Sequence, residues 1–203
     1  CGSFGHISTF SFYANKQITT GEGGMISTNN VKIFNKCKSL RNLCFGKIDR
    51  FNHADIGWNY RITNIQAALG LSQIKNLSKM VNKKISIGKR YYNNLRFNKN
   101  IFIQPPENSF SKNIYWVVGV VIKNKKIKAK KLMQKLNYYG IGTRPFFWPM
   151  NKQSIVIQRE KKDRETYPNS EYLSQYGLYL PSYFTLKNKD IDYISNVVNK
   201  LLK

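Results

Sequence analysis

Apolar and polar residues alternate in different ways along the chain, and the changes predict its local elements. Near the N-terminus, Phe10 and Phe12 alternate with polar neighbours, as expected for a strand. The stretch GMIST at 24–28 predicts a second short strand, separated from the first by a glycine-rich turn. Apolar residues at helical spacing then predict a helix over 31–43, with Cys37 and Cys44 on its apolar stripe.

The longest periodic stretch covers residues 65–95. Its apolar residues recur mostly at three- and four-residue spacings, with lysines and asparagines between them: Ile65, Leu69, Ile74, Leu77, Val81, Ile85, Tyr92 and Leu95. This spacing predicts one long helix, or two helices that meet at a bend near Gly70 or Gly88.

The remaining half of the chain alternates between strand-like and helix-like segments. The apolar run at 114–122 predicts a buried strand, and 129–140 predicts a helix capped by Gly140. Further segments predict a strand that leads into an aromatic loop at 141–150 and helices near 170–176 and 188–202. The alternation predicts the α/β class, with a domain boundary in the long helix that separates residues 1–85 from 86–203.

Composition narrows the classes of function. The 203 residues, 41% of them hydrophobic, can bury a core as one large or two small domains. The formal charge of +24 suggests nucleic-acid binding, but lysine greatly outnumbers arginine and is scattered among asparagine and isoleucine. We interpret the densest run, at 122–131, as a solvated turn, so nucleic acid is not an expected partner.

Neither a membrane nor a metal is expected as a partner. No apolar run approaches the roughly 20 residues that span a bilayer. The N-terminal residues show no initiator methionine and no signal-peptide pattern, so we expect a cytoplasmic chain that is the tail of a longer one. Cys1, Cys37 and Cys44 form no CxxC motif, and neither histidine has a partner at ligand spacing.

One lysine, Lys16, stands in an unusual context. The stretch ANKQITTGEGG at 14–24 places its amine on a tight turn between the two predicted strands, beside glycines that allow positive φ. A partly desolvated amine has a lowered pKa and attacks carbonyls. Ser11 could offer its hydroxyl to a phosphate of the same ligand. An ordinary solvated lysine is the alternative.

Four blocks in the same order carry a family resemblance. STFSFYANKQITTGEGGMIST at 8–28 resembles the lysine segment of the DegT/DnrJ/EryC1/StrS sugar aminotransferases, which are pyridoxal-phosphate enzymes of fold type I. GWNYRITNIQAALGLSQI at 57–74 is similar to that family's next signature. GIGTRPFFWPM (140–150) and YGLYLPS (176–182) resemble the C-terminal blocks of its GDP-perosamine synthase branch. The resemblance implies that residues 1–85 are the C-terminal part of the large cofactor domain and that 86–203 are the small domain.

The resemblance implies roles for four residues near the cofactor. Lys16 matches the lysine that holds pyridoxal 5'-phosphate and then carries protons, where the sister sugar dehydratases have histidine. Ser11 matches a serine that binds the cofactor phosphate, the alternative being a serine on the polar face of a strand. Asn59 matches an asparagine that reaches this phosphate from a neighbouring subunit, which implies a homodimer with shared active sites. Arg61 matches an arginine that could bind the carboxylate of the amino donor, or could instead make an inter-subunit ion pair or cap a helix.

Other positions concern the substrate. Arg144, Phe146, Phe147 and Trp148 fall in the block that lines the nucleotide-sugar end of the family's cleft, the alternative for the aromatics being core packing. Asn151 stands where the family usually has histidine. The resemblance implies transfer of an amino group from glutamate to the C4 ketone of a GDP-linked 4-keto-6-deoxyhexose, with another nucleotide or a C3 ketone as the nearest alternative.

The family's upstream half supplies a carboxylate for the pyridinium nitrogen, a ring-stacking side chain and further phosphate donors. These 203 residues contain no counterpart of that half, so we expect the chain to be inactive on its own. An inactive remnant that serves as a dimerisation or binding module is the alternative from another functional class. Nucleic-acid binding through the excess of positive charge is a third hypothesis for the function.

Overall fold

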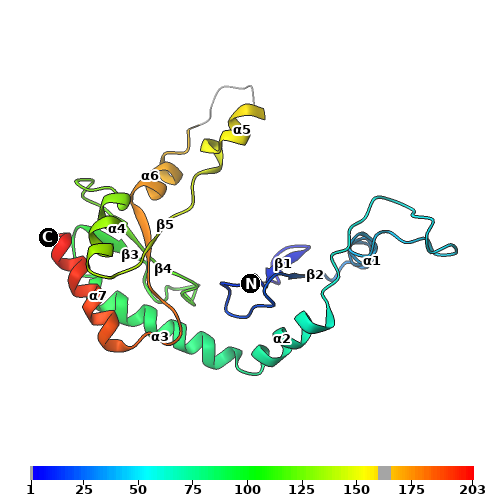
Figure 1. Cartoon of the computed structure of the whole chain (residues 1–203), viewed down its shortest axis with the longest axis horizontal. Helices are drawn as coiled ribbons and strands as arrows, with labels where there is room; N and C mark the ends of the chain where they lie inside the picture. The colour runs from blue at the N-terminus through cyan, green and yellow to red at the C-terminus, as the bar shows by residue number, and fades with distance from the viewer. Residues whose placement is uncertain (1, 160–165) are drawn as a thin grey trace. The chain divides into compact units, whose positions relative to one another are not determined.

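The computed structural model describes residues 2–159 and 166–203 and divides the chain into two compact units. Unit 1 is Cys1–Ser78 and unit 2 is Lys79–Lys203 (Figure 1). Helix α3 (Leu77–Leu95) starts at the end of unit 1 and belongs almost entirely to unit 2.

Unit 1 consists of a two-stranded antiparallel ribbon and two helices. Strand β1 (Ser8–Ser11) pairs with β2 (Gly24–Ser27), so that Ser11 lies opposite Gly24. Helix α1 (Val31–Leu40) begins at Asn30, whose side chain accepts hydrogen bonds from two backbone N–H groups of the first turn. Helix α2 (Asn64–Ile74) begins with a capping box between Thr63 and Gln66.

Helix α1 ends earlier than the pattern predicted. Leu43 and Cys44 adopt positive φ angles of 62° and 49°, which a right-handed helix cannot contain. The placement of Cys44 on a helical stripe was therefore wrong: its side chain is 1% exposed but lies beyond the helix.

The bend in the long periodic stretch was also placed wrongly. The helix breaks at Lys75–Asn76, between α2 and α3, and not at Gly70 or Gly88. Both glycines serve close packing instead. A β-carbon at Gly70 would lie 3.1 Å from Cγ2 of Thr20, and one at Gly88 would lie 2.2 Å from Cδ2 of Tyr115.

Unit 2 is built on a four-stranded antiparallel sheet of order β3-β4-β6-β5. Its elements, in chain order, are α3, β3 (Ile101–Ile103), β4 (Val118–Ile122), α4 (Ala129–Tyr138), β5 (Arg144–Pro145), the 3-10 helix η1 (Met150–Lys152), α5 (Ser154–Arg159), α6 (Pro168–Tyr176), β6 (Gly177–Leu180) and α7 (Asn188–Leu201). The mixed α/β composition agrees with the sequence prediction. Strand β4 is shorter than the predicted 114–122, because Tyr115 takes a positive φ of 49° and interrupts the extended chain.

The apolar core of unit 2 lies between its sheet and its helices. Val118, Val120 and Ile122 of β4 and Leu178 and Leu180 of β6 are buried. Helices α3, α4 and α7 contribute further fully buried side chains, among them Ile87, Tyr91, Leu95, Leu132, Leu136, Ile191 and Val198. Helices α3 and α7 are therefore ordinary amphipathic helices, whose apolar stripe packs into this core.

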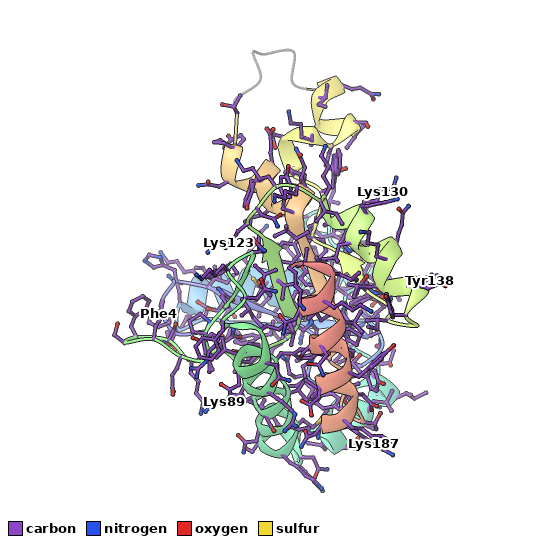
Figure 2. All side chains as sticks on the ribbon, turned by 90° about the vertical axis from the view of Figure 1, so that its left-hand side faces the viewer. Phe4, Lys89, Lys123, Lys130, Tyr138 and Lys187 are labelled. Atoms are coloured by element: carbon purple, nitrogen blue, oxygen red, sulfur yellow. The ribbon has the colours of Figure 1, made fainter. Side chains whose placement is uncertain are left out.

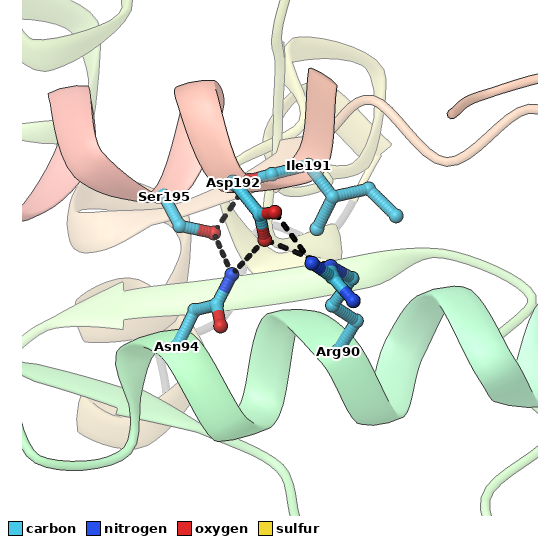
Figure 3. A network of polar contacts seen from close by, with 5 residues as sticks. All are labelled: Arg90, Asn94, Ile191, Asp192 and Ser195. Carbon is cyan, nitrogen blue, oxygen red and sulfur yellow. Dashed lines mark hydrogen bonds and ion pairs between the residues drawn. The ribbon is translucent and has the colours of Figure 1, made fainter. Parts of the chain in front are cut away.

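A polar network joins α3 to α7 beside this core (Figure 3). Arg90 binds the carboxylate of Asp192 with two guanidinium nitrogens, the Nε–Oδ1 distance being 2.8 Å. Asn94 donates to Asp192 at 2.9 Å and to Ser195 at 3.4 Å, and Ser195 donates to the backbone oxygen of Ile191. The network sets the register of the two helices along their length.

The positive charge is dispersed over unit 2. Lys89 in α3, Lys130 in α4, Lys123 after β4 and Lys187 before α7 are exposed and project outward (Figure 2). In the part of the chain that the structure describes, no helix is both long and apolar enough to cross a bilayer.

We expect Gly88→Ala to destabilise unit 2, because its new β-carbon would overlap the buried ring of Tyr115. The free energy of unfolding should fall by about 2 kcal/mol, as is typical for overpacking. Gly142→Ala is the matched control, since a β-carbon there meets nothing within 4 Å. Urea unfolding followed by circular dichroism measures both variants, and equal stabilities would contradict the packing role of Gly88.

The buried side chain of Lys84 should make the stability of unit 2 depend on pH. Its Nζ donates to the backbone oxygen of Ser182 at 2.6 Å and to its hydroxyl at 3.0 Å, and burial lowers its pKa from 10.5 to about 8. A pKa that is lower in the folded state means that stability is greatest at high pH and falls as the pH drops toward 8. Between about pH 9.5 and about pH 8 the wild type should lose about 1–2 kcal/mol, a loss that is absent in Lys84→Met and kept in the exposed-site control Lys83→Met. Denaturant titrations at both pH values measure this, and the same slope in Lys84→Met would refute it.

Candidate functional site

Lys16 lies on the connection between β1 and β2, which we call the lysine turn (residues 12–23). Backbone hydrogen bonds close the turn: the N–H of Phe12 donates to the oxygen of Gly23 at 2.9 Å, and the N–H of Thr20 donates to the oxygen of Phe12 at 3.0 Å. Gly21 and Gly23 have positive φ angles of 80° and 140°, as the glycine cluster predicted. The side chain of Lys16 is half-buried within this turn.

Threonine hydroxyl groups stabilise the turn from inside. Thr19 donates its hydroxyl to the oxygen of Phe12 at 3.0 Å and accepts the N–H of Gly21 at 2.9 Å. The buried Thr20 donates to the oxygen of Glu22 at 2.6 Å. These bonds pair backbone groups that a strand partner would otherwise satisfy, so the turn keeps a defined shape.

One face of helix α2 contacts the lysine turn. The side-chain amide of Gln73 bonds both the N–H and the oxygen of Thr19, at 3.1 and 2.7 Å. Gln66 donates to the oxygen of Glu22 at 3.2 Å. The sequence prediction assigned no role to either glutamine. The available signal was their spacing of seven residues, which puts two amides on one face of a helix.

Ser11 is the last residue of β1 and is exposed. Its hydroxyl oxygen accepts a hydrogen bond from the N–H of Tyr13 at 3.3 Å, which leaves its proton free to be donated elsewhere. Ser11 therefore lies at the end of the strand that leads into the lysine turn, five residues before Lys16.

Asn59 and Arg61 lie on a different segment of unit 1. The backbone of Trp58 and Tyr60 bonds residues 40–43 in antiparallel fashion, for example from the N–H of Trp58 to the oxygen of Leu40 at 2.7 Å. Gly57 permits this approach, because a β-carbon there would lie 2.6 Å from the nitrogen of Cys44. Asn59 and Arg61 are both exposed, and the guanidinium of Arg61 donates to the side-chain oxygen of Asn42.

The aromatic block of unit 2 divides into packed and exposed side chains. Phe146 stacks on Tyr179 with ring centroids 4.7 Å apart and fills the space beside Gly177. Phe147 and Trp148 are 72% and 63% exposed, so the core-packing alternative describes Phe146 alone. Arg144, in β5, is exposed and pairs with Tyr179 through the strand ladder.

Asn151 has a structural contact that the sequence did not indicate. It lies in η1, and its Nδ2 donates to Oε1 of Glu171 in α6 at 3.3 Å. Lys152 approaches the same oxygen at 3.3 Å. Desolvation acts to raise the pKa of Glu171, but the hydrogen bonds from Asn151 and Lys152 outweigh it and hold that pKa below its usual value.

The donors on the lysine turn suit a ligand that carries an aldehyde and a phosphate. The primary amine of Lys16 is on the turn, the hydroxyl of Ser11 is at the end of the strand before it, and Glu22 is the one acidic residue within the turn. In the described ranges, 2–159 and 166–203, no three histidine, cysteine, aspartate or glutamate side chains gather as a metal site would require. Cys1 lies outside these ranges.

Comparison with known proteins places the chain in a family. The model of the DegT/DnrJ/EryC1/StrS aminotransferase family matches residues 1–199. The chain belongs to that family. Among curated members, it is 34% identical over 200 residues to GDP-perosamine synthase of Escherichia coli O157:H7 and 31% identical over 198 residues to GDP-perosamine synthase of Vibrio cholerae. These alignments cover 98% and 97% of this chain but 52% and 53% of the relatives, so the chain spans about half of their length.

Solved structures of family members share the fold. Helicobacter pylori PseC, an aminotransferase involved in the biosynthesis of pseudoaminic acid, superposes with a TM-score of 0.88 at 27% identity, over 98% of this chain and 54% of that one. An Escherichia coli GDP-4-keto-6-deoxy-D-mannose-3-dehydratase with bound hydrated pyridoxal phosphate superposes with a TM-score of 0.86 at 22% identity, over 100% of this chain and 56% of that one. The predicted fold, part of a fold type I aminotransferase, is confirmed.

The contrast between Phe146 and Phe147 can be measured directly. Phe146→Ala should lower the free energy of unfolding by about 2 kcal/mol, because it empties a half-buried site between Tyr179 and Gly177. Phe147→Ala removes the same group from an exposed position and should change stability by less than about 0.5 kcal/mol. Chemical denaturation of the two variants compares them, and similar losses would show that Phe147 is also a packing residue.

Proposed function

We propose that the protein is a pyridoxal-phosphate-dependent aminotransferase. It transfers an amino group from glutamate to the C4 ketone of a nucleotide-linked 4-keto-6-deoxyhexose, with GDP as the nucleotide. The observation that carries the proposal is the position of Lys16, a half-buried residue on a turn that hydrogen bonds hold to helix α2, in a chain related to GDP-perosamine synthases.

Lys16 is the proposed catalytic residue. Pyridoxal phosphate, when bound, supplies an aldehyde that takes up amines and a ring that accepts electrons. A primary amine can bind such an aldehyde covalently, and once free it can accept and return a proton at Nζ. Histidine can move protons but cannot form the covalent link, so a lysine at position 16 favours amino-group transfer over dehydration.

Ser11 and Asn59 are proposed to hold the cofactor phosphate. The hydroxyl proton of Ser11 is free to donate to an anionic oxygen, while its oxygen accepts from Tyr13. Asn59 is exposed on a segment fixed to residues 40–43, which suits a contact with a second subunit. We therefore propose a homodimer with shared active sites, in which Arg61 binds the carboxylate of the amino donor.

The sugar nucleotide is proposed to lie against the exposed loop of unit 2. The guanidinium of Arg144 can bind two oxygens of a phosphate group at once, and Phe147 and Trp148 offer exposed ring faces to a sugar or a base. The indole N–H of Trp148 donates to the oxygen of Lys152 at 2.9 Å, which limits the orientation of that ring.

We further propose that catalysis needs additional polypeptide, corresponding to the other half of the relatives, and that the 203 residues alone are inactive. Apolar side chains of unit 1 are exposed in a manner unusual for a finished surface, among them Phe51, Ile56, Ile65 and Leu69. The same exposure favours a second candidate function, an inactive module that binds another protein chain.

The variant Lys16→Met tests the catalytic proposal. The 203 residues, together with the additional polypeptide proposed above, are incubated with pyridoxal phosphate, reduced with borohydride and digested, and the modified lysine is located by mass spectrometry. We expect the label on Lys16 in the wild type and its loss in Lys16→Met. Aminotransferase turnover with glutamate and the GDP-linked ketose should fall at least about a thousandfold, because both the covalent link and the proton carrier are lost.

Lys32→Met is the control, since Lys32 is an exposed lysine of the same unit. It should keep both the label and the turnover. A label spread over many lysines, with turnover unaffected by Lys16→Met, would refute the aminotransferase proposal. Absence of both label and turnover in the wild type, together with retained dimerisation, would favour the binding module.

A further inference from the structure

We propose that Gln73 is a positioning residue for Lys16: its side-chain amide fixes the lysine turn to helix α2 and so sets the direction of the amine. The inference rests on the proposed function of Lys16. It concerns a residue that contacts neither the cofactor nor the substrate but acts through the backbone of the turn.

The contact between Gln73 and Thr19 has the form of a backbone pair. Oε1 of Gln73 accepts the N–H of Thr19 at 3.1 Å, and Nε2 donates to the oxygen of Thr19 at 2.7 Å. Nε2 also donates to the oxygen of Leu69 at 2.9 Å, one turn earlier in α2. This third bond requires a donor at that end of the amide and therefore determines which way it faces. Thr19 follows Lys16 by three residues, so the hydrogen bonds from Gln73 hold the backbone three residues away from Lys16.

The whole inner face of α2 serves the same contact. In α2, all of whose residues the structure describes, only Gln66, Gly70 and Gln73 are not exposed. Gln66 bonds the oxygen of Glu22, and Gly70 lets the helix approach Thr20. The spacing of four and then three residues places these three on one stripe.

This stripe inverts the usual arrangement of an amphipathic helix. Ile65 and Leu69 are 77% and 50% exposed, while the amide-bearing side packs against the turn. Apolar burial therefore contributes little to the attachment of α2 to the turn, and directional hydrogen bonds determine their relative orientation. Nε2 of Gln17, the residue next to Lys16, is buried without a hydrogen-bond partner in the described chain, so the turn does not satisfy all of its own polar groups.

Gln73→Met and Gln73→Glu test the inference. Methionine keeps the length of the side chain and removes both bonds to Thr19. Glutamate keeps its shape and the acceptor for the N–H of Thr19, but puts a carboxylate oxygen against two carbonyl oxygens. Gln134→Met is the matched control, because Gln134 is exposed in α4 of unit 2.

The readout is the rate at which borohydride traps pyridoxal phosphate on Lys16, measured over a range of cofactor concentrations. At saturating cofactor we expect the trapping rate of both Gln73 variants to fall about 10- to 100-fold, as expected for a misdirected reacting group. The half-saturating concentration should change little, because the phosphate contacts are intact. Hydrogen exchange at the Thr19 amide should become faster in Gln73→Met, while Gln134→Met should match the wild type in every measurement.

Three outcomes would overturn the inference. An unchanged trapping rate in both Gln73 variants would show that the hydrogen bonds between Gln73 and Thr19 do not direct the amine of Lys16. A higher half-saturating concentration with an unchanged maximal rate would assign Gln73 to binding. Loss of trapping together with exchange throughout unit 1 would make it a folding residue. Trapping on a lysine other than Lys16 in the wild type would instead refute the proposed function, so the two failures are distinguishable.

Discussion

Hydrogen bonding between α2 and the lysine turn is the constraint on which the candidate site depends. Among the described residues of unit 1, β1 and β2 form a two-stranded sheet by themselves, with no third strand beside the turn. A two-stranded ribbon is marginally stable by itself. Its loop can hold the side chain of Lys16 in one place only if a rigid element is bonded to it. Helix α2 is that element, and its glutamine side chains supply the missing backbone partners.

Different interactions stabilise the interior of each unit. Unit 2 buries an apolar core between an antiparallel sheet and helices, and the network of Arg90, Asn94 and Asp192 aligns two of those helices. Unit 1 buries almost no apolar side chains; Thr20, Cys44 and Gly70 are its buried residues in the described chain. The proposed chemistry thus belongs to the unit that relies on polar contacts. Unit 1 instead exposes large apolar side chains such as Phe51 and Ile65, which no core of its own covers.

Local signals predicted the elements that local chemistry controls. Gly140 ends α4 with a positive φ of 72°, as expected for a C-cap glycine, and the glycines of the lysine turn adopt the left-handed angles that their cluster indicated. Predictions failed where the conformation of a residue depends on a contact with a residue far away in the sequence. Gly88 was interpreted as a possible bend because nothing in its neighbourhood in sequence shows the ring of Tyr115, which packs on it from 27 positions away. The predicted helix ran on to Leu43, because the sequence shows neither the hydrogen bond from the N–H of Leu43 to the oxygen of Trp58 nor the one from the N–H of Ala54 to the oxygen of Cys44.

The sequence by itself indicated the family, most of the helices and the first two strands, and one lysine that stands out among many. These follow from motifs and from residues a few positions apart. Only the tertiary structure decided which side of α2 faces the lysine turn, that Phe146 packs while Phe147 is exposed, and that Asn151 ties η1 to α6. The physical reason is that periodicity shows a helix has two faces, whereas the contacts that each face makes depend on residues far away in the chain.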